Sequence, residues 1–310
     1  MTALLKSVYR RLFPVALRER ISYLREWGAV VVNYALMRSK IANLFHSFGA
    51  WPHALYIEGT NICNAACVFC AYPQMKRPKV TMPMETFRKA IDEYLALGPA
   101  EVDLTPIVGD PFADKHLFER LDDLSARPGV KKFHFYTNAI LMKPAQIERL
   151  MPYGERFRIF CSFGGFTPEV YHRIMGVDKF HEAVASIRSL IEAKIRTGSR
   201  IQIQVNLRVP RGDEGGEFWD YLSLRKREGV ITLDAVADYD NWGGKILNET
   251  LSAAGLIPKP PPGHSGACRR LLTGPVLLSD GRVNACCCRD VEATLIIGDI
   301  NTQPLKDILS

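Results

Sequence analysis

From residue 54 to about residue 237, short apolar runs rich in β-branched and aromatic residues alternate with longer stretches whose apolar residues recur every three or four positions. The short runs predict β-strands, and the longer stretches predict amphipathic helices. Because parallel strands must be joined by crossover connections, this alternation predicts an α/β fold built as a six-stranded parallel (β/α)6 partial barrel. The predicted strands are residues 54–58, 101–105, 131–137, 156–162, 200–209 and 231–237, and the predicted helices are residues 84–97, 115–126, 143–151 and 216–228, with two more through Arg173 and Ala193.

Two segments with a different pattern flank this unit. Residues 1–50 repeat apolar positions at helix spacing, which predicts an N-terminal helical extension. Stretches rich in Gly and Pro mark the end of the barrel, so we expect three parts, residues 1–50, 51–244 and 245–310. In the last part, the turn Ser279-Asp280-Gly281 lies between two short apolar runs and predicts a small C-terminal Cys-rich hairpin extension.

The positive charge of the chain is concentrated near its start. The formal net charge is +7, and residues 1–50 hold eight Lys or Arg against two acidic residues. We therefore expect no nucleic-acid cleft in the body of the protein, whereas a peripheral membrane contact through residues 1–50 is a candidate interaction. The apolar stretch at residues 27–37 is much shorter than the roughly 20 residues that span a bilayer.

Eight cysteines occur, and six of them fall in two tight groups. No secretory signal pattern opens the sequence, so we expect a reducing, cytoplasmic location in which cysteines bind metal more readily than they form disulfides. Cys63, Cys67 and Cys70 follow the first predicted strand, at the edge where α/β sheets place their active sites. A structural zinc site needs four ligands, whereas three thiolates on a four-iron cluster leave one iron open to bind a substrate or cofactor.

The spacing C-x3-C-x2-C, with Phe69 before the last cysteine, resembles the signature of the radical S-adenosylmethionine (radical SAM) superfamily. The resemblance extends over residues 53–244 and implies a catalytic 4Fe-4S cluster held by Cys63, Cys67 and Cys70. It also implies that S-adenosylmethionine binds the open iron. One electron, delivered to the cluster by a donor such as flavodoxin or ferredoxin, then cleaves this cofactor to a 5′-deoxyadenosyl radical. A zinc-binding or fortuitous cysteine loop is the alternative.

The same resemblance identifies residues that would bind S-adenosylmethionine. Gly109 and Asp110 stand in a Val-Gly-Asp-Pro sequence where the family has a Gly-Gly-Glu-Pro-like turn. A Gly-Asp-Pro sequence is also a common turn, which is the alternative for these two residues. The remaining candidates are Asn138 in a Thr-Asn sequence, Ser162 at the end of the fourth strand, and Gln204 and Asn206 on the polar face of the fifth strand. The alternative for the last two is that the polar face belongs to an exposed edge strand.

The second cysteine group is the run Cys286, Cys287 and Cys288, which a hairpin turn brings back toward the single Cys268. The spacing of these four cysteines resembles the SPASM or twitch extension of radical SAM enzymes and implies an auxiliary iron–sulfur cluster. The family's later cysteine ligands do not occur in this sequence, and neighbouring side chains of a strand point in opposite directions. A redox-inert remnant or a zinc knuckle is therefore the alternative.

Cys161 and Cys268 are candidate hydrogen donors to a substrate radical, although a buried strand cysteine usually acts as a small apolar residue. The resemblance implies an oxidoreductase that abstracts hydrogen from its substrate, by dehydrogenation or epimerisation. Residues 1–50 lack the β-hairpin pattern of a leader-binding winged-helix module, which favours a small hydroxylated substrate over a peptide. A peptide maturase and a non-catalytic iron–sulfur or zinc-binding partner protein are the alternatives.

Overall fold

A computed structural model of the chain describes residues 24, 28, 54–259 and 274–309. Apart from positions 24 and 28, the predicted N-terminal extension lies outside the described residues, and so does Cys268. None of the described helices is both long enough and apolar enough to cross a membrane.

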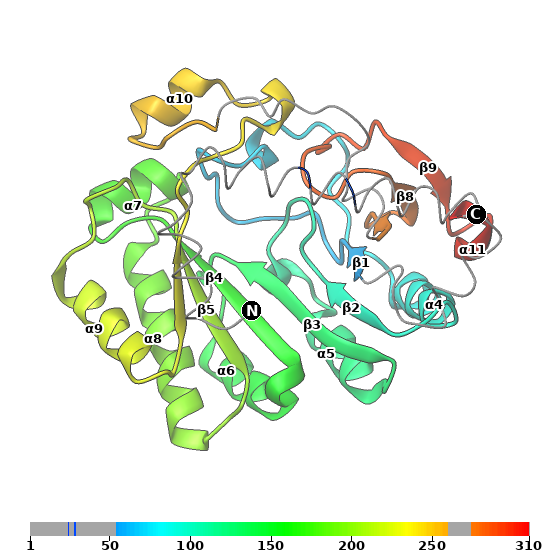
Figure 1. The fold of residues 1–310 in the computed structure, drawn as a ribbon, viewed down its shortest axis with the longest axis horizontal. Helices are drawn as coiled ribbons and strands as arrows, with labels where there is room; N and C mark the ends of the chain where they lie inside the picture. Colours follow the sequence, from blue (N-terminus) through cyan, green and yellow to red (C-terminus); the bar gives the residue numbers. More distant parts are fainter. Residues whose placement is uncertain (1–23, 25–27, 29–53, 260–273, 310) are drawn as a thin grey trace.

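Six parallel strands form the body of the sheet, which confirms the predicted fold class. They run in the order β6-β5-β4-β3-β2-β1, and each pairs in parallel with its neighbour. Figure 1 shows the sheet curved like the wall of an open barrel, with helices along its outer side. The strands are β1 (Ala54–Ile57), β2 (Ala100–Asp103), β3 (Val130–Thr137), β4 (Phe157–Phe163), β5 (Gln202–Leu207) and β6 (Thr232–Ala235).

The helices bury a stripe of apolar residues against the sheet, as their sequence pattern predicts. In α8 (Phe180–Thr197) the buried positions Ile187, Leu190 and Ile191 lie three and four residues apart and so face the same side. The two helices predicted between β4 and β5 are both present, and Gly176 ends the first of them in a left-handed conformation. The other helices are α4 (Met84–Leu95), α5 (Leu117–Ala126), α6 (Pro144–Leu150), α7 (Pro168–Met175) and α9 (Gly216–Arg227).

Strand β4 shows that the sheet has one buried apolar face and one partly exposed face. Phe157, Ile159, Cys161 and Phe163 alternate along the strand and are all fully buried, on the side that the helices cover. The residues between them are partly exposed apart from Phe160, so they face the interior of the partial barrel. Positions that carry chemistry must lie on this second face.

The C-terminal segment does not form a separate unit but extends the same sheet. Strand β7 (Val276–Leu277) pairs in parallel with β1, and β8 (Arg282–Asn284) and β9 (Ile296–Asp299) follow in antiparallel order. The predicted hairpin is therefore present. It does not form a free tail but extends the sheet to nine strands. The short helix α11 (Leu305–Ile308) lies beside α4 in Figure 1, and the N–H of Leu305 donates to Glu93 Oε2 at 2.6 Å.

Three short elements have no counterpart among the sequence predictions. Helix α10 (Asn248–Ala253) has six residues, α11 has four, and β9 has four residues that include Gly298. Segments this short hold too few periodic positions to stand out in a sequence. Four 3₁₀ turns complete the described elements, namely η1 (Tyr72–Gln74), η2 (Pro111–Ala113), η3 (Met151–Arg156) and η4 (Trp242–Gly244).

Candidate active site

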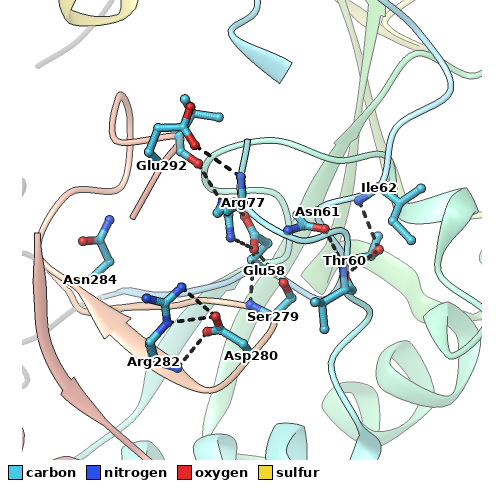
Figure 2. A network of polar contacts seen from close by, with 12 residues as sticks. Glu58, Thr60, Asn61, Ile62, Arg77, Ser279, Asp280, Arg282, Asn284 and Glu292 are labelled. Carbon is cyan, nitrogen blue, oxygen red and sulfur yellow. Dashed lines mark hydrogen bonds and ion pairs between the residues drawn. The ribbon is translucent and has the colours of Figure 1, made fainter. Parts of the chain in front are cut away.

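The loop that carries the first cysteine group leaves the carboxyl end of β1 and is closed at its base by hydrogen bonds. The side chain of Asn61 accepts the N–H of Val80 (2.7 Å) and donates to the carbonyl of Pro78 (2.8 Å). The hydroxyl of Thr60 accepts the N–H of Ile62 at 3.2 Å (Figure 2). The two Asn61 bonds join the chain before Cys63 to the chain after Cys70, so both ends of the loop are fixed.

The far side of the loop rests on the end of α7. The N–H groups of Ala66 and Val68 donate to the carbonyls of Met175 (3.1 Å) and Ile174 (2.9 Å). The helix stops there because Gly176 adopts a positive φ of 69°. A Cβ at Gly176 would lie 2.3 Å from the carbonyl oxygen of Ala66, so only glycine permits this contact.

The three thiols of the loop lie in a poorly solvated environment. Burial raises the pKa of Cys63 to about 12 and that of Cys70 to about 11, and it also raises the pKa of Cys67 well above its usual value. Negative charge on neighbouring groups adds to this effect for Cys63 and Cys67. The thiolate forms therefore need positive charge beside them, which metal ions supply when they displace the protons.

The donor set of this loop is three cysteine sulfurs in a C-x3-C-x2-C spacing. Among the described residues, no three His, Cys, Asp or Glu side chains are already placed as ligands of one metal ion. A four-iron cluster takes each cysteine thiolate on a separate iron, whereas a structural zinc ion takes four ligands. Cys63, Cys67 and Cys70 would therefore hold three irons of a cluster and leave the fourth without a protein ligand.

A single cavity of about 600 Å³ connects the two cysteine groups. Its wall includes all three cysteines of the first group and Cys287 and Cys288 of the second. The size lies within the range of cofactor and substrate sites in enzymes. Of the predicted cofactor-binding residues, the cavity wall includes Gly109, Asp110, Asn138 and Ser162.

Asp110 joins the ends of β2 and β3 at the rim of this cavity. Its Oδ2 accepts the hydroxyl of Thr137 and the N–H of Asn138, both at 2.9 Å, and its Oδ1 accepts the N–H of Phe112 at 3.0 Å. Burial raises the pKa of this carboxyl although the three hydrogen bonds act in the opposite direction. Gly109 precedes it with a φ of 110°, and a Cβ there would lie 2.3 Å from the carbonyl oxygen of Thr60.

Asn138 reaches from this rim to the cysteine loop. Its side-chain amide donates to Asn64 Oδ1 at 2.9 Å and lies 3.8 Å from the sulfur of Cys63. The loop after β3 is thereby fixed to the loop after β1, next to the first thiol.

Four of the predicted site residues that the structure describes lie away from the cavity wall, namely Gln204, Asn206, Cys161 and Cys286. Gln204 and Asn206 do not line the cavity, and the amide of Gln204 donates to Asn206 Oδ1 at 2.8 Å. Cys161 is fully buried on the helix-covered face of β4, where burial raises its pKa to about 12. This placement gives the Cys161 thiol no access to a substrate in the cavity, since the strand's pleat turns it to the opposite face.

The cavity wall also contains residues to which the sequence alone assigned no role. Arg208 continues the polar face of the fifth strand beyond Asn206, and its guanidinium carbon lies 5.1 Å from the centre of the Phe69 ring. Trp242 donates its indole N–H to the carbonyl of Phe69 at 2.8 Å, and the rings of Phe69 and Tyr239 lie 5.6 Å apart. The polar alternation of the fifth strand could have indicated Arg208. Which of the polar residues on that strand reaches the cavity depends on tertiary structure, and the sequence pattern does not give it.

The second cysteine group lies on a bend after β8, not within a strand. Cys287 is buried, and its sulfur lies 3.3 Å from that of Cys288. A hydrogen bond with Cys288 and partial burial raise the pKa of Cys286 well above its usual value. Cys287 and Cys288 both line the cavity because the backbone is not extended here, whereas Cys286 does not line it.

Comparisons with known proteins agree with this geometry. A family model for the radical SAM superfamily matches residues 57–213, a little over half of the chain. A second model, for the SPASM iron-sulfur cluster-binding domain, matches residues 268–310.

Curated relatives of this chain carry the name GTP 3′,8-cyclase, and two of them illustrate the similarity. The protein of Desulforamulus reducens is 22% identical over 195 residues, which are 61% of this chain and 57% of that protein. The probable GTP 3′,8-cyclase of Thermococcus kodakarensis is 25% identical over 189 residues, which are 61% of this chain and 58% of that protein. The chain thus matches less than two thirds of the length of these relatives.

Solved structures with a similar fold include two that contain S-adenosylmethionine. BtrN in complex with AdoMet and 2-DOIA has a TM-score of 0.53 and 15% identity, over 82% of this chain and 80% of that chain. Native anSMEcpe with bound AdoMet has a TM-score of 0.53 and 15% identity, over 84% of this chain and 80% of that chain. At this identity the similarity shows a shared fold.

Proposed function

This chain belongs to the radical SAM superfamily, and from that premise we propose that it cleaves S-adenosylmethionine reductively and abstracts hydrogen from a small hydroxylated substrate. The observation that carries the proposal is the shared cavity, because Cys63, Cys67 and Cys70 line it together with Cys287 and Cys288. A substrate in this space would lie between the two cysteine groups. Such a position suits a reaction that removes hydrogen at one group and an electron at the other.

Cys63, Cys67 and Cys70 would hold the catalytic 4Fe-4S cluster. When bound, that cluster supplies the electron that cleaves S-adenosylmethionine and yields the 5′-deoxyadenosyl radical. Gly109, Asp110, Asn138 and Ser162 would bind the polar groups of the cofactor, since all four line the cavity. We assign no such contact to Gln204 and Asn206, which lie outside the wall.

The charge of the cavity wall supports a polar substrate that is not strongly anionic. Asp238 pairs with Lys259 at 3.8 Å, and Asp240 pairs with Arg289, so these charges offset one another. A nucleoside triphosphate, the substrate class named for the curated relatives, would need an excess of cations. The charged side chains of the wall are Asp103, Asp110, Asp238 and Asp240 against Arg208, Lys259 and Arg289.

The placement of the thiols supports dehydrogenation rather than epimerisation. Oxidation of a CH–OH group to a ketone requires loss of one hydrogen atom, then of one electron and the hydroxyl proton. The cavity carboxylates are bases for that proton, and the second cysteine group is the site where a cluster would accept the electron. Epimerisation instead needs a thiol that returns a hydrogen atom. Of the two candidate donors, Cys161 has no access to the cavity and Cys268 lies outside the described residues, while Cys287 and Cys288 are assigned here to a cluster.

The test is reconstitution of the full chain with iron and sulfide under anaerobic conditions, followed by reduction in the presence of S-adenosylmethionine. We expect 5′-deoxyadenosine, and we expect it to acquire deuterium from a sugar or aminocyclitol deuterated at a carbinol carbon, with a ketone formed in equal amount. Mass spectrometry of both products is the measurement.

Two parallel assays separate the alternatives. Deuterated GTP and deuterated peptides replace the polyol, the peptides because anSMEcpe has also been solved with a bound peptide. Label transfer from GTP or a peptide alone would contradict the substrate class, and absence of 5′-deoxyadenosine in every mixture would favour a non-catalytic cluster-binding protein.

A further inference from the structure

A buried ion pair closes the base of the cysteine loop. Glu58, directly after β1, is fully buried, and the Arg77 side chain is 6% exposed. The guanidinium of Arg77 binds both carboxylate oxygens, with Nη1 donating to Oε1 at 2.8 Å and Nη2 donating to Oε2. Figure 2 shows this pair at the centre of a network that spans three parts of the chain.

Both partners of the pair also bind the C-terminal segment. Glu58 Oε1 accepts the N–H of Ser279 at 3.2 Å and its hydroxyl at 2.9 Å. Arg77 Nε donates to the carbonyl of Val291 at 2.7 Å. Glu292 Oε2 in turn accepts the backbone N–H of Arg77 at 3.3 Å.

The contacts with the C-terminal segment lie on both sides of the second cysteine group in the sequence. Ser279 lies in the turn between β7 and β8, before Cys286, and Val291 lies three residues after Cys288. Arg77 lies seven residues after Cys70 on the other side. The network therefore fixes the loop of the first group to both flanks of the second, across the cavity that they share.

The chemistry of the pair indicates a positioning role. Burial of two charges costs free energy that apolar packing of similar volume would avoid, so a buried pair of this kind adds little stability. The pair instead fixes the relative orientation of the segments that it joins. The planar guanidinium can donate to the Glu58 carboxylate and to the Val291 carbonyl only from one orientation.

We propose that Glu58 and Arg77 are positioning residues that hold the second cysteine group at a fixed place relative to the first and so couple cofactor cleavage to substrate oxidation. The inference rests on the proposed function. Neither residue is among those that line the cavity, so the pair acts through the segments that it joins and not on the substrate.

The test replaces Arg77→Lys in the full chain. Lysine keeps the charge that Glu58 needs, but an ammonium group cannot also reach the Val291 carbonyl from the bidentate position. Ser279→Ala is the second variant and removes the hydroxyl hydrogen bond to the Glu58 carboxylate while it keeps the ion pair. The matched control is Arg196→Lys, because Arg196 pairs with Glu148 at the surface, with side chains that are 61% and 52% exposed.

The first measurement needs no cofactor. In hydrogen–deuterium exchange of the metal-free protein, we expect residues 276–299 to exchange at least about tenfold faster in Arg77→Lys, with α8 unchanged. The control variant should match the wild type in both regions. Unchanged exchange in residues 276–299 of Arg77→Lys would overturn the positioning role.

The second measurement uses the reconstituted enzyme. We expect 5′-deoxyadenosine formation within about twofold of the wild type, while the oxidised product formed per 5′-deoxyadenosine falls about tenfold or more. Ser279→Ala should show the same change to a smaller extent. An unchanged product ratio, or a parallel loss of both products with iron content, would overturn the coupling role. A wild type that forms no 5′-deoxyadenosine contradicts the proposed function, and exchange then decides the positioning role on its own.

Discussion

The variant with Cys63→Ala, Cys67→Ala and Cys70→Ala should form no 5′-deoxyadenosine and should bind about four fewer irons per chain than the wild type. The reason is that these three thiols line one cavity and would be the ligands of the catalytic cluster. Because burial raises the pKa values of Cys63 and Cys70, their thiolate forms need the positive charge of bound metal ions. Colorimetric iron assay, electron paramagnetic resonance of the reduced protein and chromatography of the cofactor products are the measurements.

The matched control for this variant is Cys161→Ala. That thiol lies in the apolar core and does not line the cavity, so the variant should keep its iron and its cofactor cleavage. Any four-iron signal that survives in the triple variant must come from the second cysteine group. Continued 5′-deoxyadenosine formation by the triple variant would refute the assignment, and loss of all iron would show that the C-terminal segment binds no cluster.

Gly176→Ala should unfold more readily and load less iron, whereas Gly198→Ala should only unfold slightly more readily. Both glycines end helices with a positive φ, 69° and 65°, so an alanine at either costs about 1 kcal/mol of backbone strain. Only at Gly176 would the new Cβ meet backbone, 2.3 Å from the carbonyl oxygen of Ala66, while nothing lies within 4 Å at Gly198. The extra clash must displace the cysteine loop.

Urea unfolding of the metal-free variants and iron content after reconstitution check this expectation. We expect a loss of about 3 kcal/mol or more in the free energy of unfolding for Gly176→Ala, against about 1 kcal/mol for Gly198→Ala. Equal stability and equal iron content in the two variants would mean that the contact between α7 and the cysteine loop does not shape the site.

The parallel body of the fold was predictable because its signal is local. A buried strand such as β4 shows its own alternation, and an amphipathic helix such as α8 shows its own stripe. The cysteine spacing also lies within a few residues, which is why the loop and its ligands could be identified. The pairing of β7 with β1 depends on residues about 220 positions apart, and no local pattern encodes it.

The contents of the cavity were only partly predictable for a related reason. Polar alternation along β5 indicates which residues share a face of the strand but not which of them reaches the cavity, and Arg208 rather than Gln204 or Asn206 lines it. Arg77 sits in the basic sequence Lys-Arg-Pro-Lys, which resembles a solvated charged surface. Only the arrival of Val291 and Ser279 from the C-terminal segment buries the Glu58–Arg77 pair.

The position of β1 between β2 and β7 has a consequence for how the protein is made on the ribosome. Strand β1 precedes every other described strand. One of its edges, however, can form its hydrogen bonds only after residues 276–277 have been synthesised, about 220 residues later. Until then, that edge and the adjoining cysteine loop lack their final neighbours, a situation in which unpaired strands are prone to aggregate. Glu58 likewise has no Ser279 to bind until that point. Insertion of iron and sulfide into the first site is therefore expected to follow synthesis of the C-terminal segment, and a ribosome-bound chain that stops before residue 276 should acquire no stable cluster.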